Sequence, residues 1–403
     1  MNNGLAHLHL YPFERLAEIR RSITLSKTKS PIDLSIGEPK HPTPAFIIET
    51  LNAHLGEVAK YPATRGTEAL RQVFVDWLIA RYRLPAQSLS AESNVLPVNG
   101  TREALFAIAQ CVINKEESRP TVRPIVIMPN PFYQIYEGAA LLAGAEPYFV
   151  NCLSERNFVP DFDAVPEEIW ERCQLIYLCS PANPTGTVLD VNTFIRLMEL
   201  ADRYDFVIAS DECYSEIYSD ENHPPVGLLQ AAAHIERTDY HRCLVFNSLS
   251  KRSSVPGLRS GLVAGDAALI RSFLSYRTYH GCAMPFYAQA ASQAAWQDEA
   301  HVLENRRLYR EKMNAVLEIL APVLEVKRPA ASFCLWPETP LDDVGFTRGL
   351  WERENVTVLP GSFLARPAAG RNPGHNHVRM ALVPSLGECV DAATRIRNYL
   401  NLL

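Results

Sequence analysis

The sequence predicts an α/β fold, in which a mostly parallel sheet is flanked by helices and is followed by a smaller α+β part. Between residues 125 and 265, short runs of Ile, Val and Leu are bounded by turn residues, and helical stretches such as 191–203 separate several of them. Strands that are buried on both faces of a parallel sheet have such continuous apolar runs. After about residue 285, a long charged helical stretch and shorter strand-like pieces indicate a second unit.

Each element follows from the spacing of its apolar residues. Apolar positions three and four apart predict helices over residues 45–60, 67–82, 101–113, 191–203, 286–320 and 387–401. Continuous apolar runs predict the sheet strands 95–98, 125–128, 147–150, 175–178, 206–209, 243–246 and 261–265. The shorter strand-like pieces are FCLW, VTVLP and HVRMALV. We therefore expect an N-terminal segment (1–45) that packs with a small domain (286–403), and a large domain (46–285) between them.

Composition and charge exclude several classes of protein. The 403 residues include 39 Lys and Arg against 45 Asp and Glu, and this net charge of −6 argues against a nucleic-acid partner. No apolar run approaches the ~18 residues that span a bilayer, and no secretory signal is evident, so we expect no membrane partner. The nine cysteines are scattered without a CxxC pair, which indicates reduced thiols in a cytoplasmic protein and no metal site.

Polar residues follow five of the predicted strands. These groups are 99–102, 129–133, 180–186, 210–214 and 247–251, with Arg259 eight residues after the last of them. Each group alone has an ordinary structural explanation: Gly100-Thr101 can be a helix N-cap, Asp211 a hydrogen-bond acceptor and Lys251 a solvated surface lysine. Because ligands bind beyond the carboxyl ends of the strands in open α/β sheets, the five groups together indicate one binding site.

Three of these stretches resemble a known family. SPANPTG, ASDECYSEIY and NSLSKRSSVPGLRSG are similar to segments of the fold-type I pyridoxal-phosphate (PLP) aminotransferases of class I/II. The resemblance runs from IDLSIGEPKHPTP to HVRMALV, which is nearly the whole chain. It implies a large PLP-binding domain with a seven-stranded, mostly parallel sheet, pyridoxal 5'-phosphate as cofactor, and amino acids and 2-oxo acids as substrates.

The resemblance also implies how the cofactor ring is held. Lys251 would form the Schiff base with PLP and later transfer the α-proton, since an amine of lowered pKa is a good nucleophile and base. Asp211 would pair with the pyridinium nitrogen and keep the ring protonated as an electron acceptor. Asn183 and Tyr214 would donate hydrogen bonds to the ring phenolate oxygen, and Tyr133 would stack on the ring face.

The phosphate of the cofactor would lie at the start of a helix. The backbone N–H groups of Gly100, Thr101 and Arg102 would bind it there, because free N–H groups and the helix dipole favour an anion. Ser248 and Arg259 would add side-chain contacts.

The remaining assignments concern the substrate and a second subunit. Tyr61 matches the tyrosine that reaches the phosphate of the neighbouring subunit, which implies a homodimer with shared active sites. Arg379 matches the arginine that binds the substrate α-carboxylate, for which its planar fork is suited. Gly37 matches a substrate-loop glycine. Lys40 and Arg277 are candidates for binding the distal end of a long anionic substrate, with solvated loop charges as the alternative.

The implied reaction is ping-pong transamination, in which two substrates use one pocket in turn. The stretches IDLSIGEPKHPTPAF, NPFYQIYEGAALLAGAEPYFV and SLSKRSSVPGLRSG look most like the bacterial succinyldiaminopimelate aminotransferases of lysine biosynthesis. We therefore expect amino transfer between glutamate/2-oxoglutarate and N-succinyl-LL-2,6-diaminopimelate/N-succinyl-2-amino-6-oxopimelate.

Two alternatives stay open at this point. The first is an aminotransferase of the same family for aspartate, aromatic or alanine-type substrates, and the second is a PLP lyase on the same scaffold. A PLP-binding transcription regulator would need a DNA-reading domain that the first 45 residues do not supply. A catalytically silent binding protein is disfavoured because Lys251 and Asp211 are both present.

Overall fold

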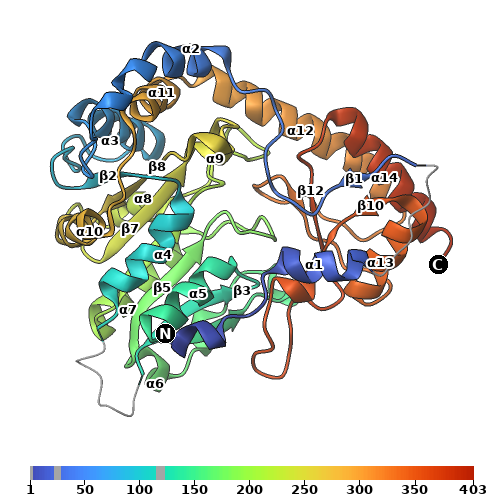
Figure 1. Ribbon diagram of the computed structural model, residues 1–403. Helices are drawn as coiled ribbons and strands as arrows, with labels where there is room; N and C mark the ends of the chain where they lie inside the picture. Colours follow the sequence, from blue (N-terminus) through green and yellow to red (C-terminus); the bar gives the residue numbers. More distant parts are fainter. Residues whose placement is uncertain (1–2, 22–28, 115–122) are drawn as a thin grey trace.

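A seven-stranded sheet forms the centre of the larger part of the molecule (Figure 1). The computed structural model describes residues 3–21, 29–114 and 123–403. The strands of this sheet are β2 (Val95–Val98), β3 (Ile125–Asn130), β4 (Glu146–Asn151), β5 (Cys173–Cys179), β6 (Val207–Asp211), β7 (Cys243–Ser248) and β8 (Gly261–Gly265). All of them coincide with the predicted apolar runs, so the predicted strands are confirmed.

The sheet is mostly parallel, as predicted. Its strand order is β2-β8-β7-β6-β5-β3-β4, and β8 runs antiparallel to both of its neighbours while the other pairs are parallel. The carboxyl ends of β3, β5, β6 and β7 therefore lie along one edge of the sheet. Because β2 and β7 are both antiparallel to β8, the carboxyl end of β2 lies at this edge as well, and all five predicted polar groups therefore come to the same region.

Helices cover both faces of the sheet because neighbouring strand residues point to opposite sides. In β6, Ile208 belongs to one apolar cluster and Ala209 to the other. The helices of the larger part are α2 (Ala45–Ala53), α3 (Glu68–Tyr82), α4 (Thr101–Val112), α5 (Gln134–Ala143), α6 (Glu167–Trp170), α7 (Val191–Tyr204), α8 (Leu228–His234), α9 (Leu249–Arg252), α10 (Ala267–His280) and α11 (Phe286–Gln297). Side chains of α3, α7, α8 and α11 pack on one face, and those of α4, α5 and α10 on the other.

The smaller part has its own sheet and core. Its elements are α12 (Ala300–Leu320), β9 (Cys334–Leu335), α13 (Asp343–Glu354), β10 (Val356–Thr357), β11 (Leu359–Pro360), β12 (Val378–Ala381) and α14 (Leu386–Leu400). The order β11-β12-β9 is antiparallel, and a third apolar cluster fills the space between this sheet and its helices. This is the expected α+β unit.

The N-terminal segment joins the smaller part through backbone pairing. After α1 (Pro12–Arg21), β1 (Ile32–Asp33) pairs in parallel with β10. This pairing brings the loop between β1 and α2 to the boundary between the two parts of the molecule. We call residues 34–44 the Gly37 loop.

The long helix predicted over 286–320 is two helices. Asp298 is extended (φ −101°, ψ 125°), and its carboxylate accepts a hydrogen bond from the His301 N–H at 2.9 Å, where α12 begins. Side chains of α11 such as Ala291 and Trp296 belong to the large cluster, whereas Met313 of α12 belongs to the small one. The change of core therefore lies between Trp296 and Met313. The helix predicted over 45–60 likewise ends at Ala53, and a 3₁₀ turn (Leu55–Ala59) follows it.

None of the helices in the described ranges is both long enough and apolar enough to cross a membrane.

Candidate active site

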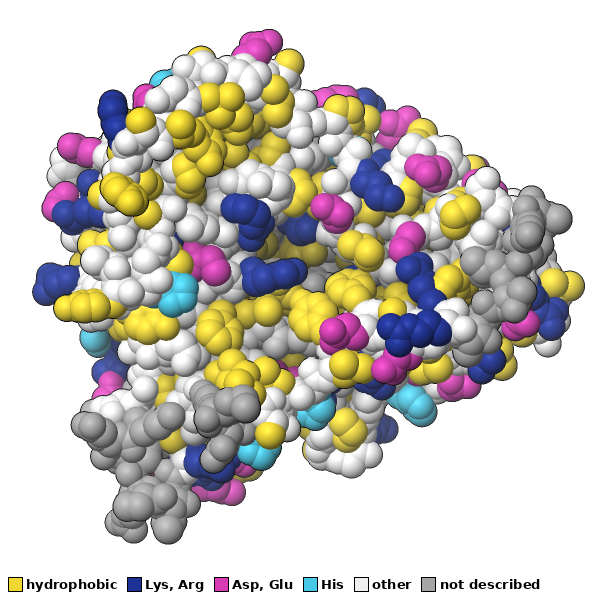
Figure 2. Space-filling view, viewed as in Figure 1, with side chains coloured by type: hydrophobic (Ala, Val, Ile, Leu, Met, Phe, Trp, Pro, Cys, Tyr) yellow, Lys and Arg dark blue, Asp and Glu magenta, His cyan; other side chains and the backbone are white. Residues whose placement is uncertain are grey.

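Loops from both parts of the molecule meet in one hollow. Figure 2 shows Lys and Arg side chains gathered in this hollow, between the sheet of the larger part and the smaller part. Thr101 Oγ1 lies 2.9 Å from Cys213 Sγ, so the segments after β2 and β6 are in contact. Arg379 Nη1 of β12 donates to Asn183 Oδ1 at 3.0 Å, which joins the smaller part to the loop after β5.

Lys251 lies among these loops, since its amine interacts electrostatically with Cys213 and Arg379. It lies on the single turn of α9, whose N-cap Ser248 accepts a hydrogen bond from the Ser250 N–H through its hydroxyl at 3.1 Å. Lys251 Nζ donates to the carbonyl oxygen of Gly37 and lies 5.5 Å from the centroid of the Phe333 ring. Burial of the amine lowers the pKa of Lys251 to about 8. A lysine with such a pKa is neutral often enough near neutral pH to act as a nucleophile and base.

Asp211 ends β6 as a buried carboxylate. Its Oδ2 accepts a hydrogen bond from Tyr136 OH at 2.7 Å, and its Oδ1 accepts one from the Cys213 N–H at 3.2 Å. Burial raises the pKa of Asp211, while these two hydrogen bonds act in the opposite direction. The sequence interpretation missed Tyr136, because a tyrosine near the start of a helix gives no sign that its hydroxyl reaches a carboxylate.

Groups suited to bind a phosphate lie at the N-terminus of α4. Gly100 has φ +81° and ψ 150°, and a Cβ placed on it would come within 2.1 Å of Arg259 Nη2. The guanidinium of Arg259 therefore lies directly against this turn. The N–H groups of Thr101 and Arg102 are in the first helical turn, where backbone N–H groups have no partner within the helix. The Gly100 N–H instead donates to Val98 O at 2.8 Å, so it already has an acceptor.

Replacing Gly100 with alanine is expected to weaken PLP binding about 5- to 150-fold. The backbone angles at this position are nearly exclusive to glycine, which costs about 1–3 kcal/mol for another residue, and the new methyl group would displace Arg259. Fluorescence titration of the apoprotein with PLP measures this change. Gly387→Ala is the matched control, because a Cβ at Gly387 meets nothing within 4 Å. Equal PLP affinities for the two variants would contradict the assignment.

Tyr133, which is predicted to stack on the PLP ring, is hydrogen-bonded to Arg102, whose backbone is predicted to bind the phosphate. Arg102 Nε donates to Tyr133 OH at 2.6 Å. Tyr133 precedes α5, and its ring lies edge-on to that of Tyr136, with the centroids 5.7 Å apart. Because Tyr136 binds Asp211, the same aromatic pair connects the predicted ring-stacking position with the buried carboxylate.

Arg379 is fixed in place with part of its guanidinium unused. Its Nη2 donates to Ser35 O at 2.6 Å, in addition to the bond from Nη1 to Asn183. Its buried Nε has no hydrogen-bond partner among the described residues. A substrate carboxylate is the natural acceptor for a buried, unpaired donor of this kind. The bond to Asn183 Oδ1 also leaves the Asn183 amide N–H₂ to donate elsewhere.

Two aromatic side chains border the same region. Phe333 and Tyr214 lie edge to face with centroids 5.3 Å apart, and a Cβ at Gly37 would be 3.3 Å from Phe333 and 3.8 Å from Tyr214 OH. Burial raises the pKa of Tyr214, so its hydroxyl stays protonated and able to donate. The sequence interpretation did not identify Phe333, because an aromatic residue in a short apolar run is usually a core residue.

The three remaining predicted residues lie in different settings. Tyr61 is fully exposed, and Lys40 is exposed on the Gly37 loop. Arg277, by contrast, is 1 % exposed, and its Nη1 donates to both carboxylate oxygens of Glu103 at 2.7 Å. Its charge is paired with Glu103 in the interior. The structure therefore does not support Arg277 as a residue that binds the distal end of a substrate.

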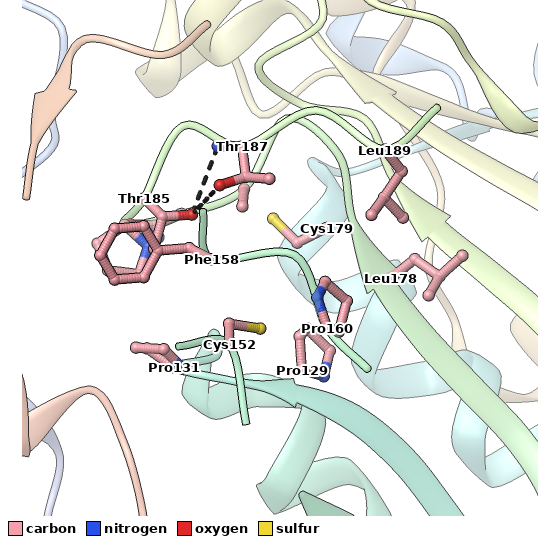
Figure 3. Close-up of a pocket in the computed structure, with 13 residues that line it drawn as sticks. Pro129, Pro131, Cys152, Phe158, Pro160, Leu178, Cys179, Thr185, Thr187 and Leu189 are labelled. Atoms are coloured by element: carbon pink, nitrogen blue, oxygen red, sulfur yellow. Dashed lines mark hydrogen bonds between the residues drawn. The ribbon is translucent and has the colours of Figure 1, made fainter. Parts of the chain in front are cut away.

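A small cavity is lined in part by the loop that carries Asn183 (Figure 3). It is lined mainly by apolar and thiol side chains, and the hydroxyl of Thr185 bonds to Thr187 instead of pointing free. Its lining residues are Pro129, Pro131, Cys152, Phe158, Pro160, Leu178, Cys179, Ala182, Asn183, Pro184, Thr185, Thr187 and Leu189. This cavity holds no charged side chain that could bind a carboxylate or a phosphate, so the hollow around Lys251 is the better candidate.

The residues of that hollow fit PLP. A buried carboxylate calls for a cationic partner, such as a protonated ring nitrogen, and the Arg259 guanidinium beside the glycine turn is a cation that suits a phosphate. A buried amine of lowered pKa can join the cofactor aldehyde.

Comparisons with known proteins agree with this geometry. The family model for aminotransferase class I and II matches residues 29–383. The LL-diaminopimelate aminotransferase of Moorella thermoacetica is 30% identical over 375 residues, which are 92% of this chain and 90% of that protein. The crystal structure of an aminotransferase from Neisseria meningitidis is 50% identical with a TM-score of 0.93, and the match covers 98% of this chain and 99% of that one.

A second solved structure, aminotransferase AspB from Helicobacter pylori, is 33% identical with a TM-score of 0.88, and the match covers 98% of this chain and 99% of that one. These similarities span both parts of the molecule and all of the segments that form the hollow. The chain therefore belongs to the class I and II aminotransferase family and is a PLP-dependent transaminase.

Proposed function

We propose that the enzyme transfers an amino group between glutamate/2-oxoglutarate and N-succinyl-LL-2,6-diaminopimelate/N-succinyl-2-amino-6-oxopimelate. The observation that carries this proposal is Arg379, a buried guanidinium with an unpaired Nε, whose charge acts on the amine of Lys251. It offers one carboxylate site to both substrates in turn. The names of the curated relatives, LL-diaminopimelate aminotransferases, support a diaminopimelate-type substrate.

The chain's own residues each have a defined task in this reaction. Arg379 binds and orients the substrate α-carboxylate, and Lys251 Nζ removes the α-proton and returns it on the other side of the amino transfer. Asn183 and Tyr214 donate hydrogen bonds into the site. The carboxylate of Asp211 stabilises a positive charge that lies next to it. PLP, when bound, supplies the electron sink that makes the α-proton removable.

Lys40 is the side chain that we propose for the distal end of the substrate. It lies three residues after Gly37, is exposed, and makes no ion pair with any residue in the described ranges. An exposed cation there, whose charge also acts on Glu388 and Lys312, suits the extra carboxylate of a succinyl group better than the distal ammonium of unacylated LL-diaminopimelate. The unacylated substrate remains the second candidate, because the relatives' names point to it.

A substrate panel on the purified holoenzyme tests this proposal. With 2-oxoglutarate as acceptor, we expect kcat/KM for N-succinyl-LL-diaminopimelate to exceed those for LL-diaminopimelate, aspartate, aromatic amino acids and alanine. Lys40→Gln should raise KM for the succinylated substrate alone. Higher kcat/KM for aspartate or for LL-diaminopimelate would overturn the substrate assignment, and stoichiometric ammonia release in place of amino transfer would indicate a lyase.

We also propose that two copies of the chain form a dimer with shared active sites. The exposed side chains of Ile48, Leu55 and Val58 lie near Tyr61 in the sequence, and Figure 2 shows hydrophobic side chains gathered over α2. An apolar patch of this kind on a solvent-exposed surface is typical of a protein–protein interface. A molar mass equal to one chain in solution would contradict the proposal. Tyr61→Phe should weaken PLP binding if this hydroxyl reaches the phosphate of the partner.

A further inference from the structure

Asn305 of α12 uses every hydrogen-bonding position of its side-chain amide. It is 7 % exposed. Its Nδ2 donates to the carbonyl oxygens of Lys251 at 3.0 Å and Arg252 at 3.1 Å. Its Oδ1 accepts from Ser254 Oγ at 3.1 Å and from His41 Nδ1 at 2.7 Å. Two donors and two acceptor sites are the full capacity of an asparagine amide.

The partners determine the orientation of this amide and the tautomer of His41. Backbone carbonyls only accept hydrogen bonds, so Nδ2 must face Lys251 and Arg252, and Oδ1 must face His41. His41 Nδ1 therefore carries the proton. Burial lowers the pKa of His41, so its ring is neutral near pH 7 and donates through Nδ1.

Asn305 provides hydrogen-bond donors to carbonyl groups at the end of the short helix α9. The last carbonyl groups of any helix lack partners within the helix, and α9 spans only Leu249–Arg252. Asn305 donates to the carbonyls of the last two of these residues. The backbone of the catalytic lysine candidate is therefore held by a side chain 54 positions later in the chain.

The same asparagine also holds the Gly37 loop through His41. This loop contacts the Lys251 turn a second time, where Lys251 Nζ donates to Gly37 O. A chain of rings follows the same path: His41 lies 4.4 Å from Tyr309, and Tyr309 stacks on Phe333 at 5.1 Å. The loop and the lysine turn are thus joined by Asn305 on one side and by the reactive amine on the other.

We propose that Asn305 is a positioning residue for transamination: it fixes the backbone of Lys251 and, through His41, fixes the Gly37 loop relative to that lysine. This inference rests on the proposed role of Lys251. Nothing in the sequence indicated it, because the four partners of Asn305 come from two segments far from it along the chain.

Two variants test separately the hydrogen bonds that Asn305 donates to the Lys251 turn and the one that it accepts from His41. Asn305→Asp keeps the size and the acceptor oxygen but loses both donations and places a carboxylate against two carbonyls. We expect kcat to fall about tenfold or more, since small misplacements of a catalytic group have effects of this size. The pH midpoint of the absorbance of lysine-bound PLP should shift as well. His41→Phe keeps the ring next to Tyr309 and removes only the donor, so it should raise KM more than it lowers kcat.

Asn314→Asp is the matched control on the same helix. Asn314 is exposed, and its side-chain oxygen accepts from Arg328 at the surface, so kcat, KM and the absorbance titration should stay at wild-type values. Thermal unfolding and PLP content are measured for all variants. If Asn305→Asp fails to fold, the KM-against-kcat split of His41→Phe decides the question.

Three outcomes bear on the proposal. A wild-type kcat and absorbance titration in Asn305→Asp would overturn it, and so would unchanged KM in His41→Phe. A shifted titration with lowered kcat, together with a wild-type Asn314→Asp, would support it. Loss of lysine-bound PLP in Lys251→Ala, measured beside these variants, shows that the underlying role of Lys251 is correct even where the role of Asn305 is not.

Discussion

Replacing Lys251 with alanine is expected to reduce transamination by about 10⁴-fold or more, because the covalent attachment of PLP and the proton transfer at the substrate α-carbon both depend on this amine. PLP should still bind through the Asp211 and Arg259 regions, which the substitution leaves intact. Two measurements check the expectation: glutamate-dependent absorbance change of the cofactor, and mass spectrometry after borohydride reduction, which detects PLP joined to the chain.

A surface lysine provides the control for this experiment. Lys327 is exposed in the smaller part, and Lys327→Ala should retain both the activity and the covalent PLP mass. Normal turnover in Lys251→Ala, or reduced PLP appearing on a different lysine, would show that the reactive amine has been assigned to the wrong residue.

The pH dependence of PLP uptake follows from the same amine. The pKa of Lys251 is lowered to about 8 by burial, and only the neutral amine attacks an aldehyde. In the apoprotein the neutral fraction therefore rises about tenfold per pH unit below that value and levels off above it. The rate of covalent PLP incorporation, followed by absorbance after mixing, should show this profile. A rate that is constant from pH 6 to pH 8 would contradict a buried, protonated amine.

Replacing Arg379 with lysine is expected to lower kcat/KM about 10²- to 10³-fold. The guanidinium is held by Ser35 O and Asn183 Oδ1, and an ammonium cannot keep these two bonds and also bind a carboxylate with a planar pair of donors. Loss of a buried charged hydrogen-bonding partner costs about 3–4 kcal/mol, which corresponds to this factor.

Both half-reactions should be affected to a similar extent, since the amino acid and the 2-oxo acid present the same α-carboxylate. Steady-state kinetics with each substrate varied in turn measures this. Arg348→Lys, at an exposed position of α13, should leave both values unchanged. An effect on one substrate only would mean that Arg379 binds a distal group instead of the shared carboxylate.

The sheet could be predicted well because its signal is local. Runs such as 175–178 and 243–246 are apolar on both faces, and a central parallel strand is the usual structure for such a run. The polar groups after these strands could also be predicted to lie together, because the carboxyl ends of parallel strands share one edge. The resemblance then added the individual roles of Lys251, Asp211 and Arg379.

The sequence analysis missed features that a long-range partner or a single local residue decides. Arg277 carries a charge that could bind a substrate, but Glu103, 174 positions earlier, neutralises it in the interior. The break between α11 and α12 depends on one extended residue, Asp298, within a stretch whose apolar spacing is helical throughout.

The amino-acid sequence alone determined the succession of strands and helices along the chain. It also determined which strand ends carry polar side chains, because both features depend on spacing within short segments. Tertiary structure decided how those side chains are held: Tyr136 on Asp211, Ser35 and Asn183 on Arg379, and Asn305 on the Lys251 turn. The physical reason is that each of these contacts is a hydrogen bond between residues far apart in the chain. Only tertiary packing, within the larger part for Tyr136 and Asp211 and between separate segments of the chain for the others, brings their donors and acceptors within reach.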